Sequence, residues 1–224
     1  MKGLYLLPRH LRKQTDDQRL MTGVPKLYAI LDASGFAAPS ALFSAAEELA
    51  GAGCTLLQYR NKTGNPRQIL DDAKELKRLL GSSVRLIMND RADLAVAAGF
   101  DGVHVGQDDL SPESVRKVIG EQLWLGVSTH NLEQISEADL SSATYVAIGP
   151  VFATASKANP DPVVGLEGVR RARALTRKPL VAIGGITRAN CRSVIEAGAD
   201  SVAVISDLLP DPRKSAEEFL RILG

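Results

Sequence analysis

Along most of this sequence, short apolar runs alternate with longer stretches that have the composition of helices. The runs are rich in Val, Ile, Leu and Ala, which is typical of strands that a parallel sheet buries on both faces. Eight of them are predicted as strands, at residues 26–31, 54–59, 84–88, 102–105, 123–127, 145–148, 180–183 and 201–205. A helix is predicted after each strand, at residues 40–50, 66–80, 92–98, 111–119, 132–138, 166–175, 188–197 and 214–222. This alternation indicates a parallel sheet, because each helix returns the chain to the start of the next strand.

The number of repeats selects the architecture. Eight strand–helix units in a chain of 224 residues fit a single α/β domain, the (β/α)8 TIM barrel. A doubly wound open sheet would also explain the alternation, but it usually has fewer strands. We therefore predict a barrel catalytic domain at residues 25–224, preceded by a short N-terminal extension at residues 1–24. In such a barrel the active site lies at the carboxyl ends of the strands.

The charge balance and the cysteines exclude several other classes of protein. Lys and Arg total 27 against 26 for Asp and Glu, so no general electrostatic attraction to nucleic acid or to an anionic membrane is expected. The apolar runs are much shorter than the roughly 18 residues that a membrane span needs. Two isolated cysteines, Cys54 and Cys191, argue against a disulfide framework. We predict a cytoplasmic protein without nucleic-acid or membrane partners, and the prediction allows for a homo-oligomer.

Polar side chains follow the second predicted strand at alternate positions. Gln58, Arg60 and Lys62 point the same way if the strand continues, since strand side chains alternate between faces. Two cations and an amide in one barrel mouth suit a polyanion such as a diphosphate. Taken alone, the same residues also fit a solvated loop.

Carboxylates follow the third and fourth predicted strands. Asp90 and Asp109 can approach each other because these strands are neighbours in a barrel. Two carboxylates without His or Cys partners suit Mg²⁺, which keeps waters and binds substrate phosphate. Either Asp could instead cap a helix, and Asp108 competes with Asp109 for the metal. His104 lies inside an apolar run, which favours a core or pocket residue over a base.

A second set of polar residues follows the fifth to eighth predicted strands. Ser128 can donate to a phosphate or cap the next helix. The long connection at residues 149–165 carries two hydroxyls and Lys157, which suits a phosphate-binding lid. Two glycines follow the seventh predicted strand at residues 184–185, and Ser206 follows the eighth. Barrels often bind a phosphate between these two strands through backbone N–H groups. Two phosphorylated small molecules are therefore predicted to meet in one barrel mouth.

Several motifs resemble the thiamin phosphate synthase family, also called thiamine-phosphate pyrophosphorylases. The resemblance covers about residues 26–209 and rests on the segments QYRNK at 58–62, MNDR at 88–91, DGVHVGQDD at 101–109, GVSTH at 126–130, GPVF at 149–152, TASK at 154–157, AIGGI at 182–186 and VIS at 204–206. It implies that the enzyme couples 4-amino-2-methyl-5-hydroxymethylpyrimidine diphosphate to a thiazole phosphate. The products would be thiamin monophosphate and pyrophosphate, formed by a Mg²⁺-assisted dissociative displacement.

The resemblance also implies roles for individual residues. Asp90 and Asp109 would hold Mg²⁺, and Arg60, Lys62, Ser128 and Lys157 would be catalytic. The pyrimidine diphosphate would be bound by Gln58, Tyr59, Arg60, Asn61, Lys62, Asn89, His104, Ser128 and Lys157. The thiazole phosphate would be bound by Thr154, Ala155, Ser156, Gly184, Gly185, Ile205 and Ser206.

The sequence departs from the family pattern at three positions in the predicted site. Ser156 replaces a usual Thr and keeps the hydroxyl, Ala153 replaces a common Pro, and Asp207 replaces a small residue beside the predicted phosphate site. Two other functions fit part of the pattern: a thiazole tautomerase-like isomerase and a non-catalytic barrel that binds a phosphorylated metabolite. The retained cationic and paired acidic residues argue against both.

Overall fold

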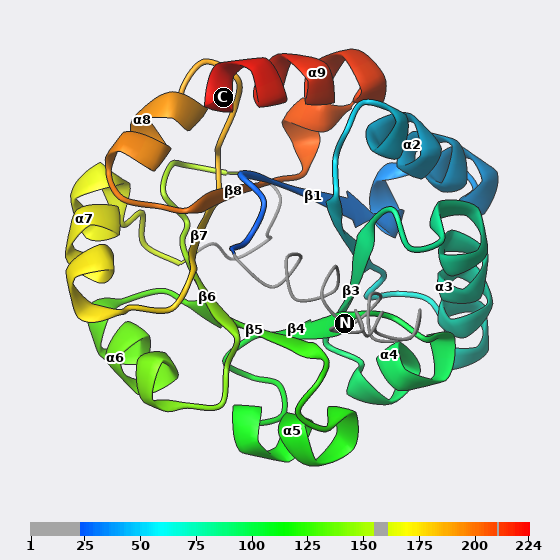
Figure 1. Cartoon of the computed structure of the whole chain (residues 1–224), viewed down its shortest axis with the longest axis horizontal. Helices are drawn as coiled ribbons and strands as arrows, with labels where there is room; N and C mark the ends of the chain where they lie inside the picture. The colour runs from blue at the N-terminus through cyan, green and yellow to red at the C-terminus, as the bar shows by residue number, and fades with distance from the viewer. Residues whose placement is uncertain (1–22, 155–160, 210) are drawn as a thin grey trace, which may run out of the picture.

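The computed structural model describes residues 23–154, 161–209 and 211–224 (Figure 1). Eight parallel strands form a closed barrel in sequence order, which confirms the predicted fold. The strands are β1 (Leu27–Asp32), β2 (Leu56–Arg60), β3 (Arg85–Asn89), β4 (Gly102–Val105), β5 (Trp124–Thr129), β6 (Tyr145–Ile148), β7 (Leu180–Ile183) and β8 (Ser201–Val204). Residues 1–22 of the predicted extension lie outside the described residues.

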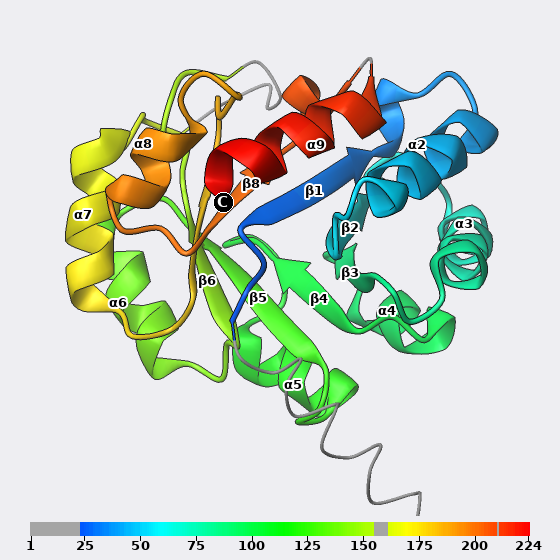
Figure 2. The same cartoon turned by 45° about the horizontal axis from the view of Figure 1, so that its top comes forward.

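Eight α-helices surround the barrel in the described part of the chain (Figure 2). They are α2 (Pro39–Gly51), α3 (Pro66–Leu80), α4 (Ala92–Ala98), α5 (Pro112–Ile119), α6 (Leu132–Leu140), α7 (Gly165–Leu175), α8 (Cys191–Glu196) and α9 (Pro212–Leu223). Helix α9 packs against α2 and α8, which closes the ring. No helix of residues 23–154, 161–209 and 211–224 has the length and apolarity that a membrane span requires.

Two short 3-10 helices were not predicted, η1 (Ala33–Gly35) after β1 and η2 (Ser206–Leu208) after β8. Helix α8 begins at Cys191, three residues later than predicted, because residues 187–190 form a turn. In that turn the Asn190 side chain accepts a hydrogen bond from the Thr187 backbone N–H at 2.8 Å. All three differences lie in segments that follow strands. At η1 and before α8, hydrogen bonds from backbone N–H groups to side chains shape the chain.

Side chains from alternate strand positions fill two separate layers. One apolar layer lies between the strands and the helices, and the other fills the inside of the barrel. At the amino-terminal end of the strands the interior is filled by Leu56, Ile87 and Trp124, with the Arg85 guanidinium 3.8 Å from the centre of the Trp124 ring. This packing closes one end of the barrel and leaves the carboxyl ends of the strands for the site.

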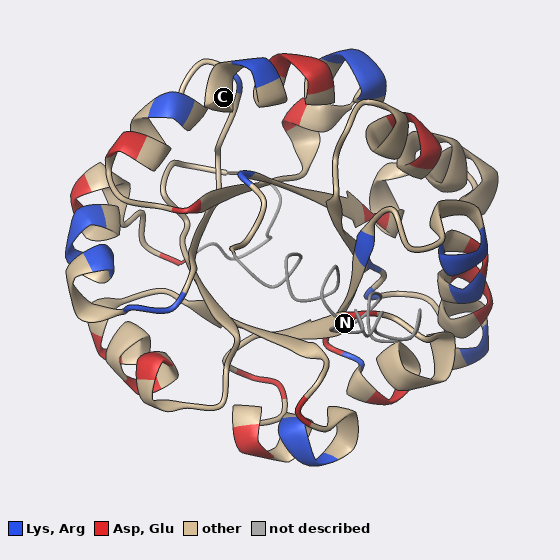
Figure 3. Cartoon of the chain, viewed as in Figure 1, with Lys and Arg blue, Asp and Glu red and all other residues tan. Residues whose placement is uncertain are grey.

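Asp101, just before β4, ties three segments together. Its carboxylate accepts a hydrogen bond from the Leu86 backbone N–H at 2.8 Å and from Lys77 Nζ at 3.1 Å. The bond to Leu86 satisfies a backbone donor of β3, and the ion pair attaches helix α3 to the start of β4. Elsewhere both signs of charge are distributed over the outer helices, in agreement with the small net charge (Figure 3).

Candidate active site

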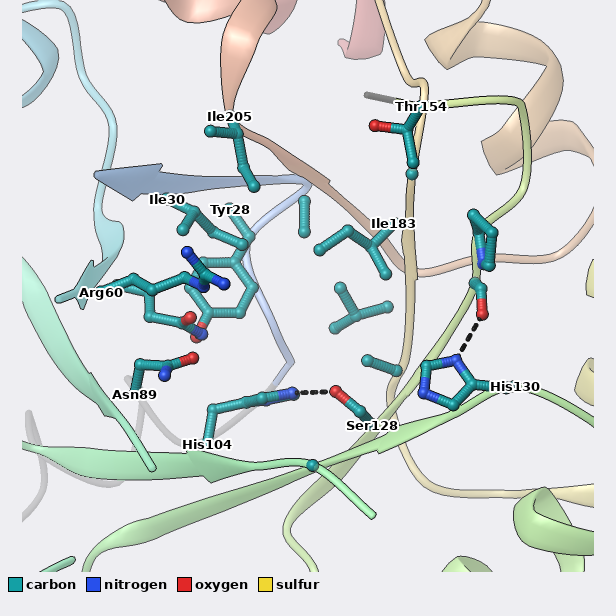
Figure 4. A pocket seen from close by; sticks show the side chains of 18 of the residues that line it. Tyr28, Ile30, Arg60, Asn89, His104, Ser128, His130, Thr154, Ile183 and Ile205 are labelled. Carbon is teal, nitrogen blue, oxygen red and sulfur yellow. Dashed lines mark hydrogen bonds between the residues drawn. The ribbon is translucent and has the colours of Figure 1, made fainter. Parts of the chain in front are cut away.

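A cavity of about 530 Å³ opens at the carboxyl ends of the strands. Residues from the ends of all eight strands and from the loops that follow them line it (Figure 4). Most of the predicted site residues are brought together here: Gln58, Arg60, Lys62, Asn89, Asp90, His104, Asp109, Ser128, Thr154, Gly184, Gly185, Ile205 and Ser206. Asp108 also lines the cavity, so the lining alone does not show whether Asp108 or Asp109 would bind a metal.

Two predicted residues of β2 and its loop do not line the cavity. The Tyr59 hydroxyl donates to Asp72 on helix α3 at 2.8 Å, and Asn61 Nδ2 donates to the Tyr59 hydroxyl at 3.1 Å. Both side chains leave the strand on the opposite face from Gln58 and Arg60, as the alternation of a strand requires. Three further predicted residues, Ala155, Ser156 and Lys157, lie outside the described residues.

Arg60 and Lys62, the two predicted cations that the structure describes, are each paired with a carboxylate of the protein. Arg60 forms an ion pair with Asp32, which is 12 % exposed at the end of β1. Lys62 Nζ lies 3.0 Å from Asp90 Oδ2. Asp32 was not predicted, although its position directly after an apolar strand is the signal that identified the other carboxylates. Its side chain also accepts from the Ser34 backbone N–H at 3.1 Å, which fixes its orientation.

Asp90 occupies a backbone conformation that is unusual for a residue other than glycine. Its φ is 62°, and its N–H donates to the His104 carbonyl of the neighbouring strand at 2.8 Å. Burial raises the pKa of the Asp90 carboxyl, Lys62 acts in the opposite direction, and the nearby Asp109 carboxylate raises it further. The two carboxylates therefore lie close enough to repel each other.

A divalent cation would relieve that repulsion, and the donor set suits Mg²⁺. Asp90 and Asp109 supply oxygen atoms alone, and Asp109 is oriented by a hydrogen bond from the Gly106 N–H at 2.7 Å. Within the described residues, no group of three or more His, Cys, Asp or Glu side chains could hold a metal. Mg²⁺ commonly uses one or two carboxylates and completes its shell with waters and phosphate oxygens.

A chain of buried hydrogen bonds crosses the inner end of the cavity. Gln58 Nε2 donates to the Tyr28 hydroxyl at 2.8 Å, and the Tyr28 and Tyr145 hydroxyls lie 2.9 Å apart. Tyr145 contacts His104 Nδ1 at 2.9 Å, and His104 Nε2 contacts Ser128 Oγ at 2.8 Å. Burial lowers the pKa of His104 to about 4 and raises the pKa of both tyrosines, so all three side chains are neutral near pH 7.

The two tyrosines in this series of hydrogen bonds were not predicted as site residues from the sequence. Both lie in apolar strand runs, where an aromatic residue is usually core. They were identifiable only through their partners across the barrel, since Tyr28 and Tyr145 are 117 residues apart. Gly126 makes room for the contact, because a Cβ there would lie within 3.0 Å of both the Tyr145 hydroxyl and His104 Nδ1.

The opposite side of the cavity is built from backbone. Gly184 and Gly185 have φ angles of 99° and 63°, which L side chains rarely adopt. A Cβ at Gly184 would lie 2.5 Å from Pro150 Cβ, so the turn is packed closely against the loop that follows β6. Asn190 Nδ2 donates to the Gly185 carbonyl at 3.0 Å and holds the turn from behind.

Asp207 is not among the residues that line the cavity. Its carboxylate accepts hydrogen bonds from the Arg188 backbone N–H at 2.8 Å and from Arg188 Nε at 3.1 Å. Arg188 Nη1 also donates to Glu218 of α9 at 2.6 Å. The carboxylate is therefore neutralised by a guanidinium, and the pair joins the loop after β7 to η2.

His130 and Asp161 lie where the loop after β6 meets the loop after β5. His130 Nδ1 contacts the Gly149 carbonyl at 2.8 Å (Figure 4). The same nitrogen lies 3.5 Å from Asp161 Oδ2. Both residues line the cavity, and neither was predicted as a site residue. The histidine stands in the GVSTH segment, so its place after a strand was the available signal.

These features define the class of the protein: a (β/α)8 barrel with a polar cavity at the carboxyl ends of its strands, the place where enzymes of this fold have their active sites. The family model described as thiamine monophosphate synthase (TMP-TENI) matches residues 27–208. The chain belongs to the thiamine monophosphate synthase family.

Individual relatives agree with this assignment. The thiamine-phosphate synthase of Koribacter versatilis is 63% identical over 203 residues, covering 89% of this chain and 96% of that protein. The thiamine-phosphate synthase of Chloroflexus aurantiacus is 42% identical over 200 residues, covering 88% and 92%. The solved structure of thiamine phosphate pyrophosphorylase from Pyrococcus furiosus superposes with a TM-score of 0.79 at 33% identity, covering 88% of this chain and 95% of that chain.

The predicted family, fold and activity are thereby confirmed. The chain is an enzyme, a transferase of thiamine biosynthesis with thiamine-phosphate synthase activity. The isomerase and the non-catalytic barrel, which were the alternative functions, are not favoured.

Proposed function

We propose that this enzyme joins 4-amino-2-methyl-5-hydroxymethylpyrimidine diphosphate to thiazole phosphate, with the two phosphorylated groups on opposite sides of the cavity. The observation that carries the proposal is the asymmetry of the cavity. One side presents Arg60, Lys62 and two close carboxylates, and the other presents the Gly184–Gly185 turn. A diphosphate with its cation suits the first side, and a monophosphate suits the second.

On the diphosphate side, Arg60 and Lys62 would bind phosphate oxygens. A guanidinium can hold two oxygens at once, whereas an ammonium acts as a compact charge. Asp90 and Asp109 would hold Mg²⁺, which when bound would supply positive charge to the departing pyrophosphate. Lys157 and Asn89 are proposed to complete this side, as the family resemblance implies.

On the thiazole side, the phosphate would bind backbone N–H groups of Gly184, Gly185 and Ser206, with Ile205 packed beside it. Glycines with positive φ can form a concave anion site of this kind. Thr154 lines the same cavity and would add a hydroxyl. The family resemblance implies that Ser156 adds a second hydroxyl and that Ala155 also contacts the thiazole phosphate.

The reaction is proposed to be dissociative. The bond between the pyrimidine methylene carbon and the diphosphate oxygen breaks, and its electron pair leaves with pyrophosphate. The thiazole nitrogen then gives its lone pair to the methylene carbocation and forms the new carbon–nitrogen bond. Arg60, Lys62, Ser128 and Lys157 would stabilise the charge that develops on the leaving group. The buried inner end of the cavity would keep water from the carbocation.

The test is a coupling assay with the full chain, both substrates and Mg²⁺, with a matched sample containing EDTA. Thiamin monophosphate is measured by oxidation to a fluorescent thiochrome. Product that depends on Mg²⁺ supports the proposal. Absence of product from folded protein contradicts the proposed pair of substrates. Equal amounts of product with and without EDTA contradict the role of the metal.

Variants test the residue roles in the same assay. Lys157→Ala and Asp109→Ala should each lower kcat by roughly a hundredfold, as expected when a group that stabilises developing charge is removed. Lys74→Ala and Asp71→Ala remove the same charges from exposed positions on α3 and should leave kcat unchanged. A variant that retains full kcat would remove its residue from the proposed mechanism.

We also propose that the enzyme works in the cytoplasm on small molecules alone. The two cysteines, Cys54 and Cys191, are both buried and free, which suits a reducing compartment. Fractionation of the producing cells, with the coupling assay applied to each fraction, tests this location. Activity in a secreted fraction would contradict it.

A further inference from the structure

The chain of five side chains at the inner end of the cavity has a direction that can be read from its chemistry. Gln58 Nε2 is a donor and cannot accept, so the Tyr28 oxygen accepts there. Within the described residues, the side-chain partners of the Tyr28 hydroxyl are Gln58 and Tyr145. The single Tyr28 hydrogen therefore has one acceptor, the Tyr145 oxygen. Leaving it unpaired in a buried site would be costly.

The same reasoning passes along the chain to the histidine. Tyr145 accepts from Tyr28, so its own hydrogen is donated to His104 Nδ1, its other side-chain contact. A neutral imidazole with a bare Nδ1 carries its hydrogen on Nε2. His104 Nε2 then donates to Ser128 Oγ at 2.8 Å.

The direction decides what Ser128 can offer to a ligand. Because its oxygen already accepts from His104, its own hydrogen is available to an acceptor in the cavity. At the other end of the chain of hydrogen bonds, Gln58 Nε2 donates to Tyr28, and Gln58 Oε1 remains as a side-chain acceptor. The cavity thus has a donor at Ser128 and an acceptor at Gln58, both of which line it.

We propose that Tyr28 and Tyr145 are positioning residues that hold His104 in the Nε2–H tautomer, and that Ser128 is thereby a hydrogen-bond donor toward the leaving diphosphate. This rests on the proposed function, in which the diphosphate occupies that side of the cavity. The tautomer itself belongs to the free protein and does not depend on the substrates. The opposite direction would place the hydrogen on Nδ1 and make His104 a base that accepts from Ser128.

Nitrogen-15 NMR of the free, full-length protein distinguishes the two directions. The chain has three histidines, and His104→Asn assigns the signal of interest by its loss. At pH 7.5 the hydrogen-bearing and bare ring nitrogens resonate far apart. A hydrogen on Nε2 supports the proposal, and a hydrogen on Nδ1 overturns it without any activity measurement.

A polarity reversal gives a second test. Gln58→Glu replaces the donor with a carboxylate of nearly the same shape, which accepts from Tyr28 instead. Every link then reverses, and the His104 hydrogen should move to Nδ1. Tyr59→Phe is the matched control, since the Tyr59 hydroxyl bonds to Asp72 on the other face of β2. An unchanged tautomer in folded Gln58→Glu would show that Gln58 does not set the direction.

Kinetics separate positioning from general stability. Tyr145→Phe keeps the ring and removes the donor to His104, so Ser128 loses its fixed orientation. We expect kcat to fall roughly two- to tenfold, the change that one lost hydrogen bond implies, with the KM for thiazole phosphate unchanged. A variant with full kcat, or with a raised KM for thiazole phosphate alone, would contradict the role. If the coupling assay itself failed, the proposed function would fall and the tautomer result would stand.

Discussion

Gly126→Ala should disrupt the hydrogen bond between His104 and Tyr145 by adding one methyl group. Gly126 lies on β5 directly beside this contact, and an added Cβ would come within 3.0 Å of Tyr145 Cζ, the Tyr145 hydroxyl and His104 Nδ1. Real Cβ atoms essentially never make such contacts. Tyr145 is fully buried and His104 is 8% exposed, so neither ring can swing into solvent.

The cost follows from two contributions. Forcing a methyl group into a packed interior typically costs about 1–3 kcal/mol. Separating the two polar groups leaves buried donors and acceptors unpaired, at roughly 1–3 kcal/mol more. The two contributions sum to about 2–6 kcal/mol, and the midpoint of about 4 kcal/mol corresponds to a fall in Tm of roughly 8–16 °C for a chain of this size.

The Tm is measured by differential scanning calorimetry, and kcat is measured in the coupling assay. Gly35→Ala is the matched control, because a Cβ there would meet Leu209 Cδ1 at an ordinary 3.7 Å. It should change the stability by less than about 0.5 kcal/mol. A Gly126→Ala protein with the wild-type Tm and kcat would refute the account of the buried chain.

Three other substitutions test separate consequences of the structure. Asp101→Ala leaves the Leu86 backbone N–H unpaired and should reduce the free energy of unfolding in urea by about 2 kcal/mol; no change would contradict its role in the barrel. Asp207→Asn weakens the bond to Arg188 and should raise the KM for thiazole phosphate roughly threefold while the KM for the pyrimidine substrate stays constant; equal rises in both would contradict a local effect. Burial lowers the pKa of His104 from 6.5 to about 4. As the pH falls below 6.5, His104 therefore takes up a proton in the unfolded chain before it does so in the folded protein. The free energy of unfolding should fall by about 3 kcal/mol between pH 6.5 and pH 4. His104→Asn should flatten that decline, and a parallel curve would refute the assignment.

The barrel was predictable because its signal is local and repeated. Strands buried on both faces appear as short apolar runs, and Pro and Gly mark many helix boundaries, such as Pro66 and Gly81 around α3. The mouth residues on β2, β3 and β4 were predictable for a related reason. Polar residues at strand ends are conspicuous against apolar runs, and the barrel brings those ends together.

What escaped prediction depends on partners that are distant in sequence. Tyr28 and Tyr145 look like core residues until their hydroxyls are seen to meet across the barrel. Asp207 looked like an unfavourable charge beside a phosphate site, and only the fold shows that Arg188 holds it. The roles assigned to Tyr59 by resemblance stay a prediction, since its side chain faces helix α3.

The internal ion pairs of the mouth have a consequence for selectivity. Two unpaired cations in an open cavity would attract any phosphate ester, because simple charge attraction does not discriminate between anions. With Arg60 held by Asp32 and Lys62 held by Asp90, an incoming anion must outcompete a carboxylate at each cation. A single phosphate that contacts one of these cations replaces one ion pair with another, so its net gain is small. A diphosphate carries more charge and more oxygens with which to replace both carboxylates, so the internal ion pairs should favour it over single phosphates.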